Sequence, residues 1–145
     1  MDHVAIMKKS WGMIPRILSK EKTIESRWYK KRSTPWGKIK KGDTIYFKNS
    51  GEPVTVKVKV NKVKEFEDLT PKKIKEILPT YYRFLGVSDR GILDFYNLVK
   101  DKKYCILIFL KNVEKLEKTY DIRKSGFGMM ASWISVEDIE KIKTL

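Results

Sequence analysis

The longest alternating stretch in the sequence is VTVKVKVNKVKEF, residues 54–66, and it constrains the fold more than any other feature. Valines occupy the even positions from 54 to 60, and polar or charged residues occupy the odd ones. This period of two predicts a strand with one buried and one exposed face. The alternation then slips, because the next valine, Val63, is at an odd position. A bulge or sharp bend near residues 61–62 would keep the valines inside, as in small barrels whose strands turn corners.

Shorter patterns predict the elements on either side of this strand. Thr70 followed by Pro71 is typical of a helix start, because threonine caps the first turn and proline fits into it. Ser135 with Asp138 has the capping-box spacing that opens a final helix. Apolar periodicity predicts strands at residues 3–9, 23–29, 44–49 and 103–116 and a short strand within 125–134, and it predicts helices at residues 15–22, 72–78, 91–99 and 136–145.

These elements sum to an α+β fold of about five or six strands in a small β-barrel. Two helices are inserted between the long strand and the continuous apolar strand, and short helices lie near both ends of the chain. A chain of 145 residues has room for one core, so residues 1–145 are predicted to form a single domain. No apolar run reaches the roughly 18–20 residues of a spanning helix, and the N-terminus is too short and polar for a signal peptide. We therefore expect a cytoplasmic protein without membrane association.

Positive charge is concentrated in the first half of the chain. The formal net charge is +14; residues 1–64 hold 17 Lys and Arg against 5 Asp and Glu, whereas residues 65–145 hold 15 against 13. Such an imbalance causes self-repulsion in the folded state and is typical of proteins that bind anions such as nucleic acid. A lysine-rich proteome is the alternative explanation, although it would spread the excess evenly along the chain.

The sequence holds one cysteine and one histidine, which excludes several kinds of site. Cys105 lies inside the apolar run YCILIFL and is predicted to be a small core residue, so neither a disulfide nor a thiolate metal site is expected. A histidine metal cluster is excluded, and Ser-His-Asp catalysis would have to use His3 itself. We expect no metal and no cofactor, and a structural role for His3.

The segment SKEKTIESRWYKK, residues 19–31, places three charged side chains close together at a predicted strand. Alternation puts Glu25 and Arg27 on the same face, about 7 Å apart at their Cα atoms, and Lys22 immediately precedes the strand. Arginine can clamp a phosphate through two hydrogen bonds, lysine supplies a point charge, and glutamate orients either one or accepts from a base amino group. The alternative is an ordinary ion pair on a solvated face, worth less than about 1 kcal/mol.

This segment resembles the signature of a known domain family. Residues 20–27, KEKTIESR, are similar to the G-x-K-x-x-E-x-R pattern of ASCH (activating signal cointegrator homology) domains, with Lys20 at the glycine position. WGKIKKGDTIYF, residues 36–47, resembles the next family element, a loop that leads through a Gly-Asp pair into a strand. The resemblance implies a PUA-like barrel across residues 1–145, with a cleft between the barrel and the helix that precedes the signature strand.

The resemblance also implies a function. ASCH domains are associated with RNA or modified nucleotides, so we predict that a basic cleft around Lys22, Glu25 and Arg27 binds RNA or a nucleotide. Some small members are amidohydrolases of acetylated cytidine, with threonine at the position of Glu25, and nuclease activity has been proposed in the family. A small nucleoside amidohydrolase or ribonuclease, with Lys22 and Glu25 catalytic, is therefore the alternative. A third reading is an adaptor whose basic face docks an acidic protein.

Aromatic residues among cations suggest a further part of the binding surface. Single-stranded nucleic-acid grooves combine rings that stack on bases with charges that pair with phosphates. Trp36 and Lys38, in the loop KRSTPWGK, fit this description. Trp28 is predicted by alternation to face the core.

Three more polar residues are predicted to contact phosphate. Lys48 is predicted to project from the outer face of its strand, although such lysines also serve simply to keep a sheet soluble. Lys124 and Ser125 precede the sequence GFG, whose glycines permit close backbone approach to a ligand. The alternative for this loop is a tight barrel-closing turn in which Phe127 fills the core.

Overall fold

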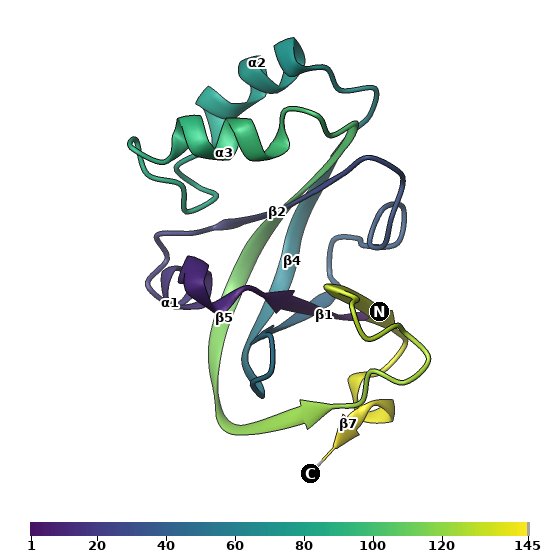
Figure 1. Ribbon diagram of the computed structural model, residues 1–145. Coiled ribbons are helices and arrows are strands. Elements are labelled where there is room, and N and C mark those ends of the chain that lie inside the picture. Colours follow the sequence, from purple (N-terminus) through teal and green to yellow (C-terminus); the bar gives the residue numbers. More distant parts are fainter. Residues whose placement is uncertain (145) are drawn as a thin grey trace.

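The alternating valine run forms strand β4 (Val54–Phe66), and the continuous apolar run forms β5 (Tyr104–Ile122). In the computed structural model, which describes residues 1–144, these strands pair antiparallel at the centre of one mixed sheet (Figure 1). The strand order is β2–β5–β4–β3–β1–β6, and β7 pairs with β5. The other elements are β1 (Asp2–Met7), α1 (Met13–Leu18), β2 (Ile24–Tyr29), β3 (Thr44–Asn49), α2 (Pro71–Tyr81), α3 (Ile92–Val99), β6 (Trp133–Val136) and β7 (Lys143–Thr144).

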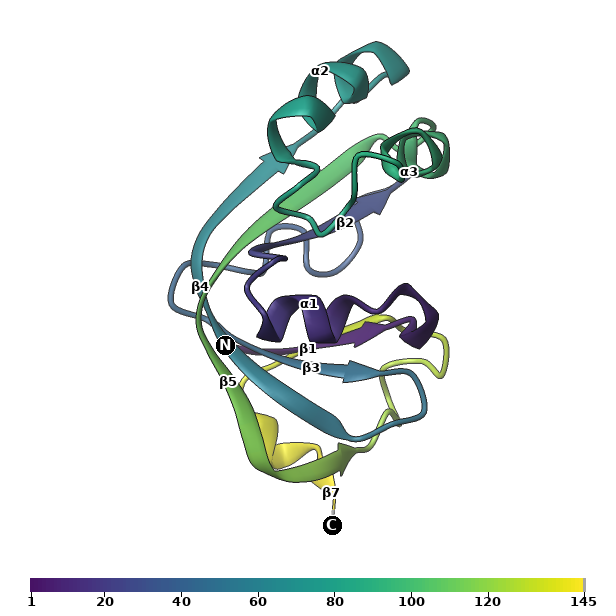
Figure 2. The same ribbon diagram turned by 90° about the vertical axis from the view of Figure 1, so that its left-hand side faces the viewer.

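The two long strands bend because their pairing register shifts. The register of β4 against β5 changes between Val60 and Lys62, and further shifts lie nearer the start of β4. The predicted bulge near residues 61–62 is therefore confirmed, and Figure 2 shows how far both strands curve. Val56, Val58 and Val60 are fully buried on the inner face, and the shift after Val60 lets Val63, at an odd position, pack against the same core.

Buried side chains form cores on both sides of the bent sheet. Inside the curve, the valines of β4 pack against β3, α1 and alternate residues of β5. On the other face, α2 and α3 cover β2 and β5 through Ile74, Leu78 and Val99. β5 is thus buried on both faces over residues 105–108, as its continuous apolar run predicted, and Cys105 is a buried free thiol.

The predicted order of elements is confirmed from β1 to β6. Both inserted helices follow β4 and precede β5, and the Thr70 side chain caps α2 by accepting a hydrogen bond from the Lys73 N–H at 3.2 Å. The fold is α+β, a small curled barrel with two inserted helices. No helix within residues 1–144 is long and apolar enough to cross a membrane.

The end of the chain differs from the prediction. A final helix over residues 136–145 was expected, but the chain makes a short 3-10 turn, η2 (Ile139–Lys141), and then the two-residue strand β7. Leu145 lies outside the described residues. β7 pairs with the end of β5, and the turn buries Ile139 and Ile142 against the outer face of the sheet. Strand pairing and this burial override the local helical pattern.

The prediction for the cap of that helix is correct for Asp138 and wrong for Ser135. Asp138 accepts a hydrogen bond from the Glu140 N–H at 3.0 Å and so caps the 3-10 turn. Ser135 does not cap it, because its hydroxyl lies 2.9 Å from Nδ1 of His3 on the neighbouring strand β1.

The two ends of the sheet face each other across a gap that we call the seam. β2 stands at one end of the strand order, and β6, beside β1, stands at the other. Arg27 on β2 spans the gap, reaching Met7 on β1 and the backbone of Ser132 just before β6. α1 lies on the concave side of the sheet, between β2 and β1 (Figure 2). The seam therefore brings residues that are far apart in sequence into one place.

Candidate functional site

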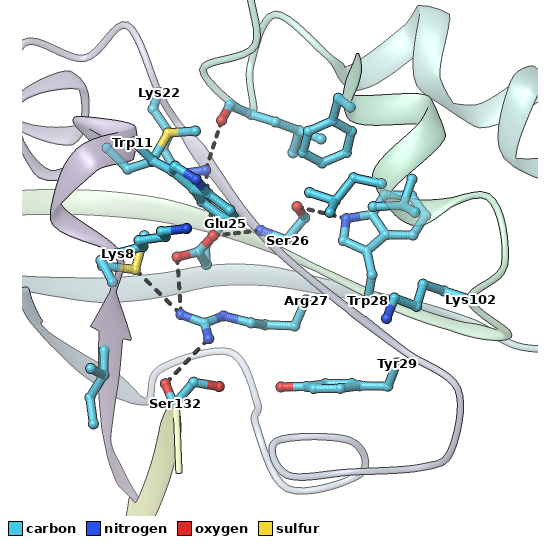
Figure 3. A pocket seen from close by; sticks show the side chains of 17 residues that line it. Lys8, Trp11, Lys22, Glu25, Ser26, Arg27, Trp28, Tyr29, Lys102 and Ser132 are labelled. Carbon is cyan, nitrogen blue, oxygen red and sulfur yellow. Dashed lines mark hydrogen bonds and ion pairs between the residues drawn. The ribbon is translucent and has the colours of Figure 1, made fainter. Parts of the chain in front are cut away.

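A pocket of about 280 Å³, the seam pocket, opens at the seam. Its volume is close to the lower end of the range for small-molecule sites, about 300–1,000 Å³. Residues from β1, the 3-10 turn η1 (Lys9–Trp11), β2 and α3 line it (Figure 3). Its lining includes Lys22, Glu25 and Arg27, which we call the seam cluster. The structure thus brings the three charged motif residues together in one pocket.

The backbone around Lys22 explains how this lysine comes to point inward. Lys20, at the position where the ASCH signature has glycine, has φ of 67°, in the left-handed region that glycine adopts most easily. Across from it, Gly86 has φ of 82°, and a Cβ atom there would lie 3.3 Å from the Lys22 Cβ. Arg16 fixes this approach by donating a hydrogen bond to the Gly86 carbonyl at 2.6 Å. The chain before β2 and the loop before α3 therefore close around Lys22.

Lys22 is buried, with 3% of its side chain exposed. Nζ donates to the carbonyls of Ile24 at 3.0 Å and Leu85 at 2.8 Å, and it lies 3.4 Å from Oε1 of Glu25. The two carbonyls accept from two of the three N–H groups of the ammonium, and the Glu25 contact is an ion pair. Burial lowers the pKa of Lys22, the Glu25 carboxylate opposes this shift, and the charge of Arg27 adds to it.

Arg27 ties the two sides of the seam together. Nη1 donates to the Ser132 carbonyl at 3.2 Å, and Nη2 donates to Sδ of Met7 at 3.3 Å. Its guanidinium carbon lies 5.0 Å from the centre of the Trp133 ring, within cation–π range. These hydrogen bonds use two of the five N–H groups of the guanidinium and hold it in place across the seam.

Glu25 lies between the two cations and has one oxygen without a hydrogen bond. Oε1 accepts from the Ser26 N–H at 2.9 Å. Oε2 is the only buried side-chain oxygen or nitrogen in residues 1–144 that has no hydrogen-bond partner. Nη2 of Arg27 lies 3.6 Å from it, just beyond hydrogen-bond distance (Figure 3). Leaving a buried polar atom unsatisfied costs about 1–3 kcal/mol, so this oxygen lacks a donor that a ligand can supply.

Aromatic side chains form the wall of the seam pocket on the α3 side. Trp28 is half-buried, and its ring packs edge-on against Phe95, with 6.0 Å between ring centres. Its indole N–H donates to Oγ of Ser26 at 2.9 Å. Trp28 packs on the core as alternation predicted, but it also lines the pocket, which alternation alone does not indicate.

The rim of the pocket holds residues that sequence reasoning missed. Trp11 and Leu98 line the pocket, although 48% and 55% of their surfaces are exposed. Lys8 and Lys102 also line it, and Nζ of Lys8 lies 5.8 Å from the centre of the Trp11 ring. The signal was present in KKSWG, residues 8–12, where an aromatic follows cations just as Trp36 does in its loop.

The other residues predicted to bind nucleic acid lie away from the seam pocket. Trp36 packs edge-on against Tyr104, at 5.1 Å between ring centres, and contacts the inner core. Lys38 is exposed, and its Nζ lies 3.4 Å from Oγ1 of Thr34 in the same loop. The structure therefore brings neither residue to Lys22, Glu25 and Arg27.

The prediction that Lys48 projects outward is wrong, because its side chain is buried. The outer face of β3 is covered by β6 and the end of β5, which pack against Tyr46, and the β3–β4 register shifts just before Lys48. Burial lowers the pKa of Lys48, and the nearby charge of Lys124 acts in the same direction. Alternation distinguishes the faces of a strand but does not show which of them a distant segment covers.

The loop with Lys124 and Ser125 lies outside the seam pocket as well. Nζ of Lys124 donates to the Met129 carbonyl at 2.6 Å, within its own loop, and Ser125 is exposed. Phe127 is exposed too, at 37%, so it does not fill the core as the alternative reading of this loop supposed.

A second buried polar group surrounds His3, and we call it the His3 cluster. The ring is fully buried: Nε2 lies 2.8 Å from Oδ2 of Asp43, and Nδ1 lies 2.9 Å from Oγ of Ser135 and 3.1 Å from Nε1 of Trp133. Since an indole N–H can only donate, Nδ1 is an acceptor and Nε2–H donates to Asp43. Burial lowers the pKa of His3 despite the adjacent Asp43 carboxylate. The cluster joins β1, β6 and the start of β3 and does not line the seam pocket.

Within the residues that the structure describes, no group of three or more His, Cys, Asp and Glu side chains is arranged to hold a metal ion. The seam pocket itself presents ammonium, carboxylate, guanidinium and aromatic groups.

Comparison with known proteins gives structural matches. No protein-family model and no curated protein matches the sequence. The structure matches ASCH from Zymomonas mobilis over 97% of this chain and 90% of that chain, with a TM-score of 0.65 and 12% identity. A serine-to-alanine variant of that protein matches with a TM-score of 0.67 and 14% identity, over 97% and 91% of the two chains. The hypothetical protein PH0355 matches over 80% of this chain and all of its own, with a TM-score of 0.52 and 22% identity. Such identities bear on the fold alone.

Proposed function

Because this chain has the fold of an ASCH domain, a PUA-like barrel, we propose that residues 1–145 act as one domain that binds RNA or a nucleotide in the seam pocket. The aromatic wall provides a surface for a base, and the basic residues around the opening attract the phosphates. The excess positive charge of residues 1–64 supports an anionic ligand.

One observation carries this proposal: a single pocket combines a buried charged end, an aromatic wall and a cationic rim. Trp28 and Phe95 present flat apolar surface of the kind on which bases stack. Lys8 and Lys102 lie at the rim, where a phosphate remains hydrated while it pairs with them. This combination fits a ligand with one flat ring system and one anionic group.

Reversing the rim charges tests the proposal without disturbing the buried residues. The double variant Lys8→Glu, Lys102→Glu is compared with Lys115→Glu, Lys118→Glu, which changes two exposed lysines of β5 outside the pocket by the same charge. RNA binding is measured by fluorescence anisotropy over a salt series. We expect the rim variant to lose about tenfold or more in affinity, and its salt dependence to fall by about one unit of slope per lysine. The β5 variant should stay close to wild type.

Two results would contradict the proposal. Equal loss of affinity in both double variants would indicate general attraction of polyanions and would favour an adaptor that docks an acidic partner. Failure of the wild-type protein to bind any RNA or nucleotide at low salt would remove the proposed function itself.

A second candidate is hydrolysis of RNA or of an acylated nucleoside in the same pocket. The observation that favours it is the buried amine of Lys22, whose lowered pKa and adjacent Glu25 carboxylate are features found at catalytic sites. Lys22→Ala should then abolish turnover, measured by chromatography of the products, whereas Lys20→Ala, at an exposed neighbour, should not. Turnover that survives Lys22→Ala would assign the activity to another site or to a contaminant.

A further inference from the structure

At the buried end of the seam pocket, one acceptor lacks a hydrogen bond although two cations lie beside it. Lys22 donates to two carbonyls and forms an ion pair with Glu25. Arg27 directs both terminal nitrogens to groups on the far side of the seam. Oε2 of Glu25, on a side chain that is 5% exposed, is left without a hydrogen bond. The buried end of the pocket therefore favours a ligand group that donates a hydrogen bond.

A phosphate does not match that requirement. Its oxygens accept hydrogen bonds and carry negative charge, so beside the unpaired oxygen of Glu25 they would be repelled. Lys22 would first have to give up hydrogen bonds that hold the loop before α3, and Arg27 already lies against Glu25, with Nη2 3.6 Å from Oε2, while it bridges the seam. Lys8 and Lys102 lie at the rim, where they are not paired with the buried residues and are at least partly open to solvent.

We infer that the seam pocket binds a nucleobase that directs an amino group at Oε2 of Glu25, with its phosphate outside near Lys8 and Lys102. This inference rests on the proposed function and adds the orientation and the chemical class of the base. Trp28 and Phe95, which pack edge-on against each other, form the wall against which the ring lies. The volume of about 280 Å³ suits one base with part of its sugar better than several nucleotides.

The inference divides the four common nucleotides into two classes. Cytosine, adenine and guanine carry an exocyclic amino group, whereas uracil has a carbonyl oxygen in its place. A site that hydrogen-bonds a ligand N–H rejects the analogue that lacks it, because the buried acceptor is then left unpaired. A uracil carbonyl would also place a second acceptor against the carboxylate.

The experiment uses matched ligands with the wild-type protein, so that it does not depend on any variant folding. Binding of the 5′-monophosphates of cytidine, adenosine, guanosine and uridine is measured by calorimetry, together with inosine and purine riboside monophosphates, which lack the amino groups of guanosine and adenosine. We expect at least one amino-bearing nucleotide to bind about tenfold more tightly than its counterpart without the amino group. Glu25→Gln, whose amide also donates, should reduce that ratio to about threefold or less.

A matched control and the opposite outcomes complete the test. Glu21→Gln makes the same change at an exposed residue of the same segment and should leave the ratio unchanged. Equal affinities across each matched pair, or tighter binding of uridine monophosphate, would overturn the inference and leave the proposed function standing. Absence of binding by every nucleotide and by RNA would overturn the proposed function. If Glu25→Gln fails to fold, the matched ligand pairs still decide the question.

Discussion

The seam cluster and the His3 cluster are both buried polar groups that connect strands distant in sequence, but they differ in how completely their atoms are paired. In the His3 cluster, both ring nitrogens have partners, and Oδ2 of Asp43 also accepts from the Lys40 N–H at 3.0 Å. In the seam cluster, Oε2 of Glu25 has no hydrogen bond. The first cluster is closed, whereas the second lines a pocket.

This difference separates a structural connection from a candidate site. A satisfied buried network stabilises one arrangement of the chain and has nothing left to offer a ligand. An incomplete network beside a pocket has an unsatisfied group that a ligand can pair, so its cost in the free protein becomes a gain on binding. The residue types alone would suggest the reverse, since serine, histidine and aspartate together suggest catalysis.

The largest expected effect is a loss of stability when Glu25, the only carboxylate of the seam cluster, is removed. Glu25→Ala leaves the buried Lys22 and the partly buried Arg27 without their counter-charge, and removing one partner of a buried ion pair costs about 3–5 kcal/mol. The free energy of unfolding in urea measures this effect. Glu21→Ala is the matched control, because Glu21 is exposed and 3.9 Å from Nε of Arg16, so it should cost less than about 1 kcal/mol. Equal, small losses in both variants would mean that the seam cluster behaves like a surface ion pair.

The next effect tests whether the His3 cluster is purely structural. His3→Ala leaves the buried indole N–H of Trp133 without an acceptor, so we expect a loss of about 1–3 kcal/mol in unfolding free energy. Nucleotide affinity of the folded variant should remain at the wild-type value. A folded His3→Ala protein that no longer binds RNA would place the His3 cluster in the binding site and would remove the distinction drawn above.

The sequence predicted the parts of the fold that depend on local patterns. The valine alternation predicted the long strand and its bend, and Thr70 predicted the start of α2. The motif spacing predicted that Glu25 and Arg27 lie close together. The apolar run around Cys105 likewise predicted a strand covered on both faces. Each of these depends on residues within one or two elements, where period and spacing determine geometry.

The parts that sequence reasoning missed depend on contacts between distant segments. Lys48 is buried because β6 and the end of β5 cover its strand face, and the final helix is replaced by pairing with β5. The rim likewise joins Trp11 and Lys8 to Lys102, about ninety positions later in the chain. Alternation and capping signals contain no information about such partners, which depend on the order and curvature of the whole sheet.

The rim offers a test that should affect binding alone. Trp11 is half-exposed, so Trp11→Ala should change the free energy of unfolding by no more than about 0.5 kcal/mol. If a flanking base of an RNA strand stacks on the indole, oligonucleotide affinity should fall by about 1–3 kcal/mol, measured by anisotropy. Trp36→Ala should leave oligonucleotide affinity unchanged, because that ring packs on Tyr104 outside the pocket. Its removal should lower the free energy of unfolding instead. Unchanged oligonucleotide affinity in Trp11→Ala would limit the ligand to the pocket itself.

The smallest expected effect is a pH dependence of stability that comes from the His3 cluster. His3 is the only histidine of the chain, and burial lowers its pKa from 6.5, with Asp43, Asp2 and the terminal amine as the charges around it. Between the lowered folded pKa and 6.5, the unfolded chain binds a proton that the folded chain does not, so stability must fall as the pH drops below about 6.5. Urea unfolding at pH 7 and pH 5 measures this loss, and His3→Ala should remove it. A gain in stability on acidification would mean that the folded protein holds a charged imidazolium against Asp43, and the His3 cluster would then be an ion pair rather than the neutral network that the Trp133 N–H requires.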